Sequence, residues 1–202
     1  MRPAARSLIR SCLALTVPLG LLVACSDPVP AIPRVIIDSQ IRPGTNGQQV
    51  CGISSREWIT IGNFGGVGTA PRPVETDQTE GSGTVTVACS VLAEGEGFRV
   101  NASATVSGAE AGTVSITGLF ASARVPQQNI TVIFSRRDFG RFEQKDCVAT
   151  YDVNANAGVA SGRVWAKVIC PKAVSTDNGE KKCETEAQFR FENCEQAAPA
   201  AK

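Results

Sequence analysis

Apolar and polar residues alternate along much of this 202-residue chain, and no other feature limits its fold so strongly. The alternation is clearest over residues 84–91, 98–106 and 184–192. Because successive side chains of an extended strand point to opposite faces, each of these segments is expected to be a β-strand with one buried face. No segment has a convincing helical period, so the sequence predicts an all-β protein.

The same period of two recurs in further segments, which brings the expected number of strands to about eight. These segments are 56–61, 113–119, 129–135, 147–153 and 163–170. Gly-rich turns separate several of them, and Glu94-Gly95-Glu96-Gly97 is expected to be a hairpin turn in which Gly supplies the positive φ angle. Many short strands at close spacing are typical of a sandwich or a barrel, and we predict a single antiparallel β-sandwich linked by disulfides.

One long segment breaks this pattern. Residues 62–83 are rich in Gly, Pro and Thr and have no periodicity. Loops longer than about 15 residues are uncommon in compact domains and are functional or mobile where they occur. We therefore expect this segment to be the least protected part of the domain.

The chain contains no His, and this excludes several familiar chemistries. A Ser-His-Asp triad, a Cys-His dyad and a His-ligated zinc site cannot be built without it. The 20 Lys and Arg residues against 19 Asp and Glu give a formal net charge of +1, which argues against a nucleic-acid-binding surface. We predict no catalytic residues, no metal ligands and no cofactor.

The first 24 residues have the layout of a secretory signal peptide. Arg2, Arg6 and Arg10 form a basic start, and an apolar run follows over residues 11–24. This run is too short to cross a bilayer, because a spanning helix needs about 20 apolar residues. A basic start, a short apolar core and a small residue before the cleavage point are typical of exported proteins.

Leu22-Val23-Ala24-Cys25 resembles the lipobox of bacterial lipoproteins. The resemblance implies that signal peptidase II cleaves before Cys25 and that the Cys25 thiol carries diacylglycerol. It also implies that the new amine is acylated, for example with palmitate. Ser26, rather than Asp, follows Cys25, which favours sorting to the outer membrane. We therefore expect a protein of the bacterial cell envelope that meets its membrane through this lipid anchor.

These features divide the chain into four expected parts. Residues 1–24 are the signal peptide, and residues 25–44 hold the lipidated Cys25 and a Pro-rich tether. Residues 45–195 form the β-sandwich domain. Residues 196–202 form a short disordered tail.

Six of the eight cysteines remain once Cys12 leaves with the signal peptide and Cys25 is lipidated. The six are Cys51, Cys89, Cys147, Cys170, Cys183 and Cys194. An even number of cysteines in an exported chain predicts a disulfide framework. A zinc site is disfavoured, because no two of them have Cys-x-x-Cys spacing and no His is present.

Sequence alone does not choose among the pairings that six cysteines allow. Distances along the chain favour one set of three: Cys170–Cys183, Cys51–Cys89 and Cys147–Cys194. An alternative pairs Cys147 with Cys170, because both lie about equally far from a hairpin tip near Gly158.

Two patterns have both a functional and a simpler interpretation. Residues 152–156 have the oxygen spacing that opens an EF-hand loop, but Ala157 and Arg163 stand where Gly and Glu are needed, so we interpret them as a hairpin tip. Paired carboxylates are the groups with which a glycosidase could work without His, although each pair is more simply a set of surface charges. The candidate pairs are Glu94 with Glu96, Glu143 with Asp146, and Glu184 with Glu186.

Trp165 is a candidate ligand anchor, because it lies on the face opposite the apolar residues Val164 and Ala166. The simpler interpretation is that both faces of the sheet are partly covered at this point. The sequence therefore leads us to expect a membrane-anchored, non-enzymatic binding or structural module with an unknown envelope or extracellular ligand. The alternative is a carboxylate-based hydrolase that acts on envelope or extracellular glycans.

Overall fold

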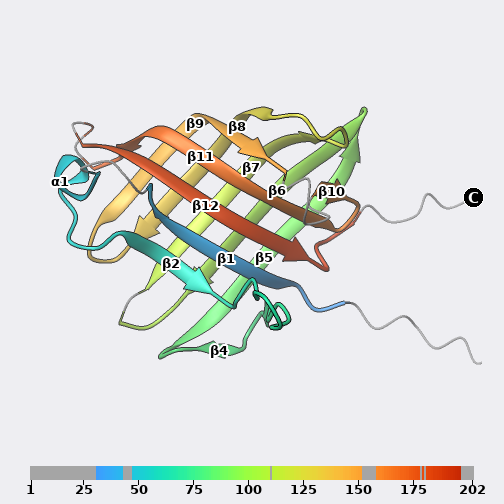
Figure 1. Cartoon of the computed structure of the whole chain (residues 1–202), viewed down its shortest axis with the longest axis horizontal. Coiled ribbons are helices and arrows are strands. Elements are labelled where there is room, and N and C mark those ends of the chain that lie inside the picture. The colour runs from blue at the N-terminus through green and yellow to red at the C-terminus, as the bar shows by residue number, and fades with distance from the viewer. Residues whose placement is uncertain are drawn as a thin grey trace, which may run out of the picture. The chain divides into compact units, whose positions relative to one another are not determined.

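Twelve strands form one antiparallel sheet in the computed structural model, which describes residues 31–42, 47–109, 111–151, 158–177, 179 and 181–196 (Figure 1). The strands are β1 (Arg34–Ile41), β2 (Glu57–Ile61), β3 (Val74–Glu75), β4 (Thr79–Glu80), β5 (Gly83–Glu94), β6 (Gly97–Val106), β7 (Gly112–Ala121), β8 (Gln127–Arg136), β9 (Gly140–Thr150), β10 (Gly158–Ala160), β11 (Arg163–Ser175) and β12 (Lys182–Glu192). Among these residues the one helix is α1 (Gly47–Cys51), which lies between β1 and β2.

The order of strands in the sheet is β2-β1-β12-β11-β9-β8-β7-β6-β5-β4, with β3 paired to β1 and β10 paired to β11. Strands β5 to β9 follow one another as neighbours, whereas β1 lies between β2 and β12. Figure 1 shows β1, β2, β11 and β12 crossing in front of β5 to β9. Because the right-handed twist of strands curls a long sheet, its two halves face each other and the sheet is nearly closed and barrel-like.

The predicted all-β, antiparallel and disulfide-linked fold is confirmed. The two layers expected of a sandwich are halves of one continuous sheet. The eight expected strands correspond to β2, β5 to β9, β11 and β12, and the structure adds β1, β3, β4 and β10. Three of these additions have only two or three residues, and such short strands cannot display a period of two.

The core lies between the two halves of the sheet and contains the apolar residues of each alternating segment. Trp58 is its largest member and is only 1% exposed. The Trp58 ring centroid lies 5.3 Å from that of Phe142 and 5.8 Å from that of Phe134. Large aromatic side chains dominate the burial of apolar area, so β2 is held against β8 and β9 through Trp58.

Strand β1 corrects the predicted start of the domain. Residues 25–44 are predicted to be a tether, yet β1 pairs with β12 along its whole length. Val35, Ile36 and Ile37 are all buried, so this strand has no period of two that would reveal it. The β-domain therefore includes Arg34 and does not begin at residue 45. The predicted signal peptide, Cys25 and residues 197–202 lie outside the described residues.

Three disulfides are present, as predicted, but the favoured pairing is wrong. Cys51 pairs with Cys183, Cys89 with Cys194, and Cys147 with Cys170, with Cα–Cα distances of 5.1, 4.9 and 4.6 Å. The expected pairs Cys170–Cys183, Cys51–Cys89 and Cys147–Cys194 do not form. The alternative, Cys147 with Cys170, is correct.

The β11–β12 register explains the error. Cys170 lies opposite Thr185, and Cys183 lies opposite Ala173, with a register shift between Cys170 and Ala173. The two cysteines at the ends of this hairpin are therefore out of step with each other. On its other side β11 pairs with β9 at Ile169 and Val148, which brings Cys170 next to Cys147.

Residues 62–83, expected to be an irregular loop, bridge β1 and β5. Strand β3 pairs with β1, and the N–H of Thr76 donates to the carbonyl of Pro33 at 3.0 Å. The N–H of Asp77 donates to the carbonyl of Val85 at 2.7 Å, and Val74 is buried. The paired segments within residues 62–83 are too short for the sequence to show an alternation of apolar and polar residues. We call the line along which β1 and β2 face β4 and β5 the seam.

Farther along the seam, the outer edge of β5 is also paired. The N–H of Glu195 donates to the carbonyl of Cys89 at 2.9 Å, and the N–H of Val91 donates to the carbonyl of Glu195 at 3.0 Å. The Cys89–Cys194 disulfide lies beside these bonds. The outer edge of β5 is therefore covered at several points along its length.

Candidate functional site

One cleft of about 250 Å³ remains open on the seam, beside β2. Residues 57–60 of β2 line one side, and residues 80–83, Val106, Ser107 and Arg136 line the rest. These segments are far apart in sequence, and only the curling of the sheet brings them together. We call this cavity the seam cleft.

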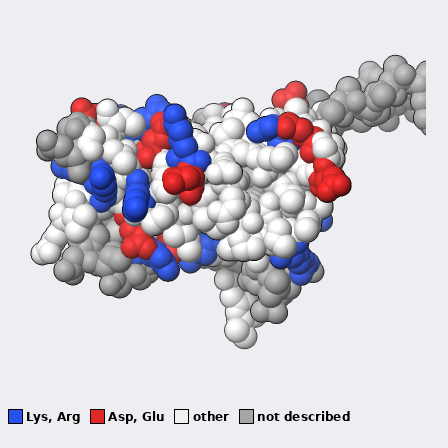
Figure 2. All heavy atoms as spheres, turned by 90° about the horizontal axis from the view of Figure 1, so that it is seen from above, with Lys and Arg blue, Asp and Glu red and all other residues white. Residues whose placement is uncertain are grey.

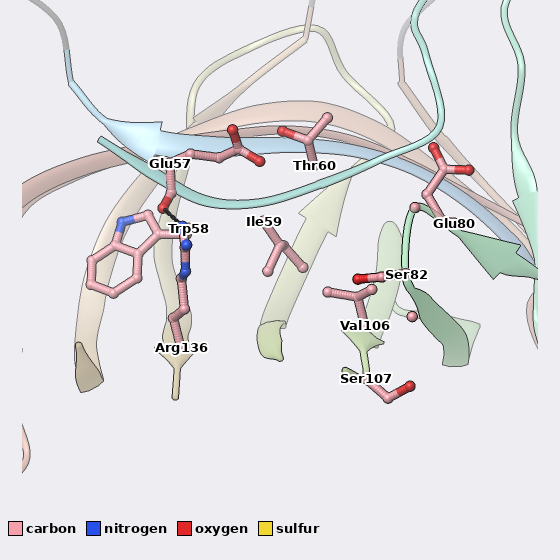
Figure 3. A pocket seen from close by; sticks show the side chains of 11 residues that line it. Glu57, Trp58, Ile59, Thr60, Glu80, Ser82, Val106, Ser107 and Arg136 are labelled. Carbon is pink, nitrogen blue, oxygen red and sulfur yellow. Dashed lines mark hydrogen bonds between the residues drawn. The ribbon is translucent and has the colours of Figure 1, made fainter. Parts of the chain in front are cut away.

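Figure 3 shows how the lining side chains are distributed. Ile59 and Val106 lie on opposite sides of the opening, with Ser82 close to Val106. Glu57, Thr60 and Glu80 lie along one rim. Most of the lining side chains are polar, and polar groups that converge in a concave site can fix the orientation of a ligand, so the seam cleft is the candidate functional site.

Arg136 closes one end of the seam cleft. Its Nη1 donates to the carbonyl of Glu57 at 2.7 Å, and its Nε lies 3.1 Å from Oδ1 of Asp138. The guanidinium carbon is 4.8 Å from the ring centroid of Phe139, a cation–π distance. The Arg136 side chain is only 10% exposed, so β8 holds the start of β2 through a nearly buried cation.

Glu80 closes the opposite end. Its carboxylate accepts hydrogen bonds from Nη2 and Nη1 of Arg72 at 2.6 and 3.0 Å, and from the N–H of Gly62 at 3.2 Å. The hydrogen bonds from Arg72 lower the pKa of Glu80 most, the Gly62 N–H adds to this effect, and partial burial opposes it. Glu80 is therefore ionised at neutral pH and links β4 to the residue that follows β2.

Between these ends, β2 is the last strand of the sheet and pairs only with β1. Trp58, Ile59 and Ile61 are at most 2% exposed, so Thr60 is the exposed residue of this stretch. Gly112 of β7 allows β2 to pass close above it, because a Cβ at Gly112 would lie 2.4 Å from Cγ2 of Ile59. This close crossing fixes the position of β2 at the cleft.

Three carboxylates, Asp38 of β1, Glu57 of β2 and Glu186 of β12, interact electrostatically, and we call them the acidic patch. Burial raises the pKa of Asp38 most, the charges of Glu57 and Glu186 raise it further, and the charge of Lys167 lowers it. The Nζ of Lys167 lies 3.0 Å from Oε2 of Glu186. Of the three carboxylates only Glu57 lines the seam cleft, and the cation Arg136 lines it too.

None of the predicted carboxylate pairs lines the seam cleft. Glu94 forms an ion pair with Arg99, Glu143 with Arg141 at 3.2 Å, and Glu184 with Arg42. Asp146 accepts a hydrogen bond from Gln144 at 2.8 Å, and Glu186 belongs to the acidic patch. Figure 2 shows acidic and basic side chains interspersed at two places on one side of the molecule, with an area free of charges between them. The simpler interpretation as surface charges therefore describes these acids, except for Glu186, which is buried.

Trp165 is partly buried and does not stand free as a ligand anchor. The guanidinium carbons of Arg190 and Arg163 lie 4.8 and 5.5 Å from its ring centroid. Arg190 also lies 5.3 Å from the ring of Phe64, so a stack of cations and aromatic rings covers this outer face. The simpler interpretation, in which both sheet faces are partly covered, applies here.

Two sequence expectations lie outside the described residues: the lipidated Cys25 and residues 152–156 of the possible calcium loop. Among the residues that the structure describes, no group of three or more Cys, Asp or Glu side chains could hold a metal ion. The same residues include no helix long and apolar enough to cross a membrane.

No family model, no curated protein sequence and no solved structure matches this chain. What the protein does is therefore inferred from the chemistry of the seam cleft and from the N-terminal sequence.

Proposed function

We propose that this protein is a lipid-anchored binding module of the bacterial cell envelope and that the seam cleft is its ligand site. One observation carries the proposal: polar side chains from separate segments, among them Glu57, Ser82 and Ser107, line one cleft together with the apolar Val106. Its volume of about 250 Å³ lies just below the range of roughly 300–1,000 Å³ typical of drug-sized ligands. The ligand is therefore small, or it contributes only a short segment.

The β2 side of the cleft is fixed by contacts on several elements, which supports a binding role. Strand β2 is held by Arg136 at its start and by the close crossing over Gly112. The Cys51–Cys183 disulfide ties the segment before β2 to β12. A site whose walls are already in place binds without the entropic cost of ordering them.

The charges favour binding over the alternative, a carboxylate-based hydrolase. Such enzymes pair an ionised carboxylate with a carboxylic acid whose pKa is raised, so that it can donate a proton. The pKa of Glu80 in the cleft is lowered instead. Asp38, whose pKa is raised, is not among the lining residues.

The anchor part of the proposal comes from the resemblance of residues 22–25 to a lipobox. The carbonyls of Ile32 and Pro33 accept hydrogen bonds from Asn193 and from the N–H of Thr76, both at 3.0 Å, so these two residues already belong to the domain. The Pro-rich residues 26–31 would then be the spacer between the lipid and the domain.

Amide NMR of the purified, detergent-solubilised protein with a library of small polar fragments tests the cleft. Fragments should shift the resonances of residues 57–62 and 80–83. Ser82→Trp should abolish these shifts, because Ser82 is an exposed turn residue whose replacement fills the cleft. Ser122→Trp, on an exposed turn elsewhere, is the matched control. Shifts that persist in S82W would reject the cleft, and glycan hydrolysis lost in Glu57→Gln would favour the hydrolase.

Mass spectrometry of the N-terminus tests the anchor. The mature protein should begin at an acylated Cys25, and Cys25→Ala should leave an unprocessed or soluble form that is absent from membranes. A mature N-terminus at another residue, without lipid, would reject the anchor but not the binding site.

A further inference from the structure

We infer that residues 62–73 form a membrane-contact element and that the side chain of Val67 enters the lipid bilayer to which the protein is anchored. We call this segment the Val67 hairpin. The inference rests on the anchor part of the proposed function, because the lipid anchor brings the domain to a bilayer. It does not depend on which ligand the seam cleft takes.

Val67 lies at the corner of a tight turn. The N–H of Gly66 donates to the carbonyl of Thr69, and the N–H of Thr69 donates to the carbonyl of Gly66, both at 3.1 Å. Gly68 has a φ angle of 77°, which a glycine adopts without strain inside such a turn. Val67 is fully exposed, more so than any other large apolar residue in the described part of the chain.

The tip of the Val67 hairpin carries no charge. Residues 63–71 read Asn-Phe-Gly-Gly-Val-Gly-Thr-Ala-Pro and include no acidic or basic side chain. Arg72, at the base of the hairpin, forms an ion pair with Glu80 at 2.6 Å. Charged groups resist entry into a bilayer, whereas an uncharged tip with an exposed Val gains free energy when its apolar surface leaves water.

The base of the Val67 hairpin is fixed to the domain. The N–H of Asn63 donates to the carbonyl of Arg72 at 3.0 Å, and the N–H of Arg72 donates to the carbonyl of Asn63 at 2.8 Å. The Phe64 ring lies 5.3 Å from the guanidinium carbon of Arg190 on the outer face of β12. An element that is already held in place presents its tip without an ordering cost on contact.

The Val67 hairpin lies beside the start of β1, where the described domain begins (Figure 1). Strand β3, which follows the hairpin, pairs with β1 at Val35, and the N–H of Thr76 donates to the carbonyl of Pro33. Ile32, one residue earlier, is 51% exposed. Two exposed apolar residues, Val67 and Ile32, therefore belong to the part of the domain to which the spacer is joined.

The lengths of the two segments are compatible with this contact. The six spacer residues 26–31 reach about 19 Å at roughly 3.1 Å per residue. One arm of the hairpin, from Asn63 to Val67, spans about 13 Å at roughly 3.3 Å per residue. The tip is therefore able to touch the bilayer while Cys25 remains anchored in it.

The lipid anchor makes a weak contact sufficient. One Val would not hold a free domain on a membrane, but the anchor keeps this domain at a high local concentration beside the bilayer. Burial of the Val67 side chain should favour the contacting orientation by about tenfold.

The test uses the lipidated mature protein in phosphatidylcholine nanodiscs that contain a small fraction of lipid with a spin label on its acyl chain. Amide NMR should show paramagnetic broadening of residues 65–70 that exceeds the broadening of the turns at 94–97 and 122–126. Val67→Trp should increase this broadening, because Trp favours the membrane interface.

Three further variants test the contribution of the Val67 side chain. Val67→Asp should lower the broadening of residues 65–70 at least about threefold, because it removes the apolar group and adds a charge. Val67→Ser removes the apolar group alone and should act in the same direction. Val125→Asp, at an exposed Val before β8, is the matched control and should leave the broadening unchanged.

The contrary outcomes are distinct. Broadening of residues 32–34 without broadening of residues 65–70 would reject the membrane contact and leave the anchor in place. Broadening of residues 65–70 that is unchanged in both V67D and V67S would reject the insertion of Val67. A mature protein without lipid that does not associate with nanodiscs would overturn both the anchor and this inference, and the fragment test of the seam cleft would be unaffected.

Discussion

The indole N–H of Trp58 donates a hydrogen bond of 2.8 Å to the hydroxyl of Thr185, although β1 lies between their two strands. The same Thr185 hydroxyl donates to the carbonyl of Gln40 in β1 at 2.8 Å. Trp58 and Thr185 are both buried. One hydroxyl group therefore connects β2, β1 and β12, and it places the largest core side chain under the strand that borders the seam cleft.

Thr185→Val should destabilise the protein, because it keeps the shape of the side chain but leaves the buried Trp58 N–H without an acceptor. Such an unsatisfied donor costs about 1–3 kcal/mol. The free energy of unfolding, measured by urea titration, should fall by that amount. Thr185→Ser retains the hydroxyl and is the matched control. Equal stability of T185V and T185S would show that this hydrogen bond contributes nothing.

Gly112→Ala should also destabilise the protein and should alter the seam cleft. The new methyl group would lie 2.4 Å from Cγ2 of Ile59, so β2 must shift, and overpacking of this kind costs about 1–3 kcal/mol. Amide shifts should extend from residue 112 to residues 58–60. Gly158→Ala is the control, since nothing lies within 4 Å of a Cβ at Gly158. If G112A unfolds at the same denaturant concentration as G158A, then the crossing of β2 over Gly112 has room for a methyl group.

Peptide mapping without reduction should recover three bridges: Cys51–Cys183, Cys89–Cys194 and Cys147–Cys170. Replacing both Cys89 and Cys194 by Ala should cost about 4–5 kcal/mol in the chain-entropy model, because they are 105 residues apart. Replacing Cys147 and Cys170, 23 residues apart, should cost about 3 kcal/mol. The reverse order of stabilities, measured in urea, would contradict the pairing or the entropic argument.

Asp38→Asn should stabilise the protein at neutral pH and flatten its dependence on pH. Burial, followed by the charges of Glu57 and Glu186, raises the pKa of Asp38 in the folded state above its usual value of 3.8. A group with a raised folded pKa contributes stability that is full below its unfolded pKa and is lost as pH rises through its folded pKa. The gain should stay below about 1 kcal/mol, because the Asp38 side chain is partly exposed.

The measurement for Asp38 is the free energy of unfolding across the range from about pH 3 to pH 8. The difference between D38N and the unsubstituted protein should grow with pH over the acid part of that range. Glu96→Gln, on the exposed turn between β5 and β6, is the control that removes one carboxylate outside the acidic patch. A D38N curve that runs parallel to that of the unsubstituted protein would mean that the acidic patch does not act on Asp38.

Local periodicity predicted the long strands, because a strand with one buried face must alternate. Phe189 and Phe191 in β12, with Arg190 between them, are the clearest example. It missed β1, because Val35, Ile36 and Ile37 are buried together and remove the alternation. It also misplaced Cys183, since the spacing of cysteines does not show where β11 ends and therefore which residues of β11 and β12 lie opposite each other.

The seam cleft could not be predicted from the sequence. Glu57, Glu80 and Arg136 belong to three separate segments, and none of them stands in a recognisable motif. Their meeting depends on how far the sheet curls before its ends face each other, which is a property of the whole domain. Of the acids that the sequence suggested, Glu94 and Glu143 instead form ion pairs with Arg99 and Arg141, which lie close to them in the chain.

The position of β1 between β2 and β12 also determines when the domain can form. Its full-length partner, β12, is the last strand to be synthesised, and two of the three disulfides join residues 132 and 105 positions apart. If the chain is exported from its N-terminus, as the proposed anchor would require, Cys51 and Cys89 would meet an oxidant before Cys183 and Cys194 arrive. A bond between these two early cysteines would be a wrong pairing, and its correction would need thiol exchange after nearly the entire chain has emerged.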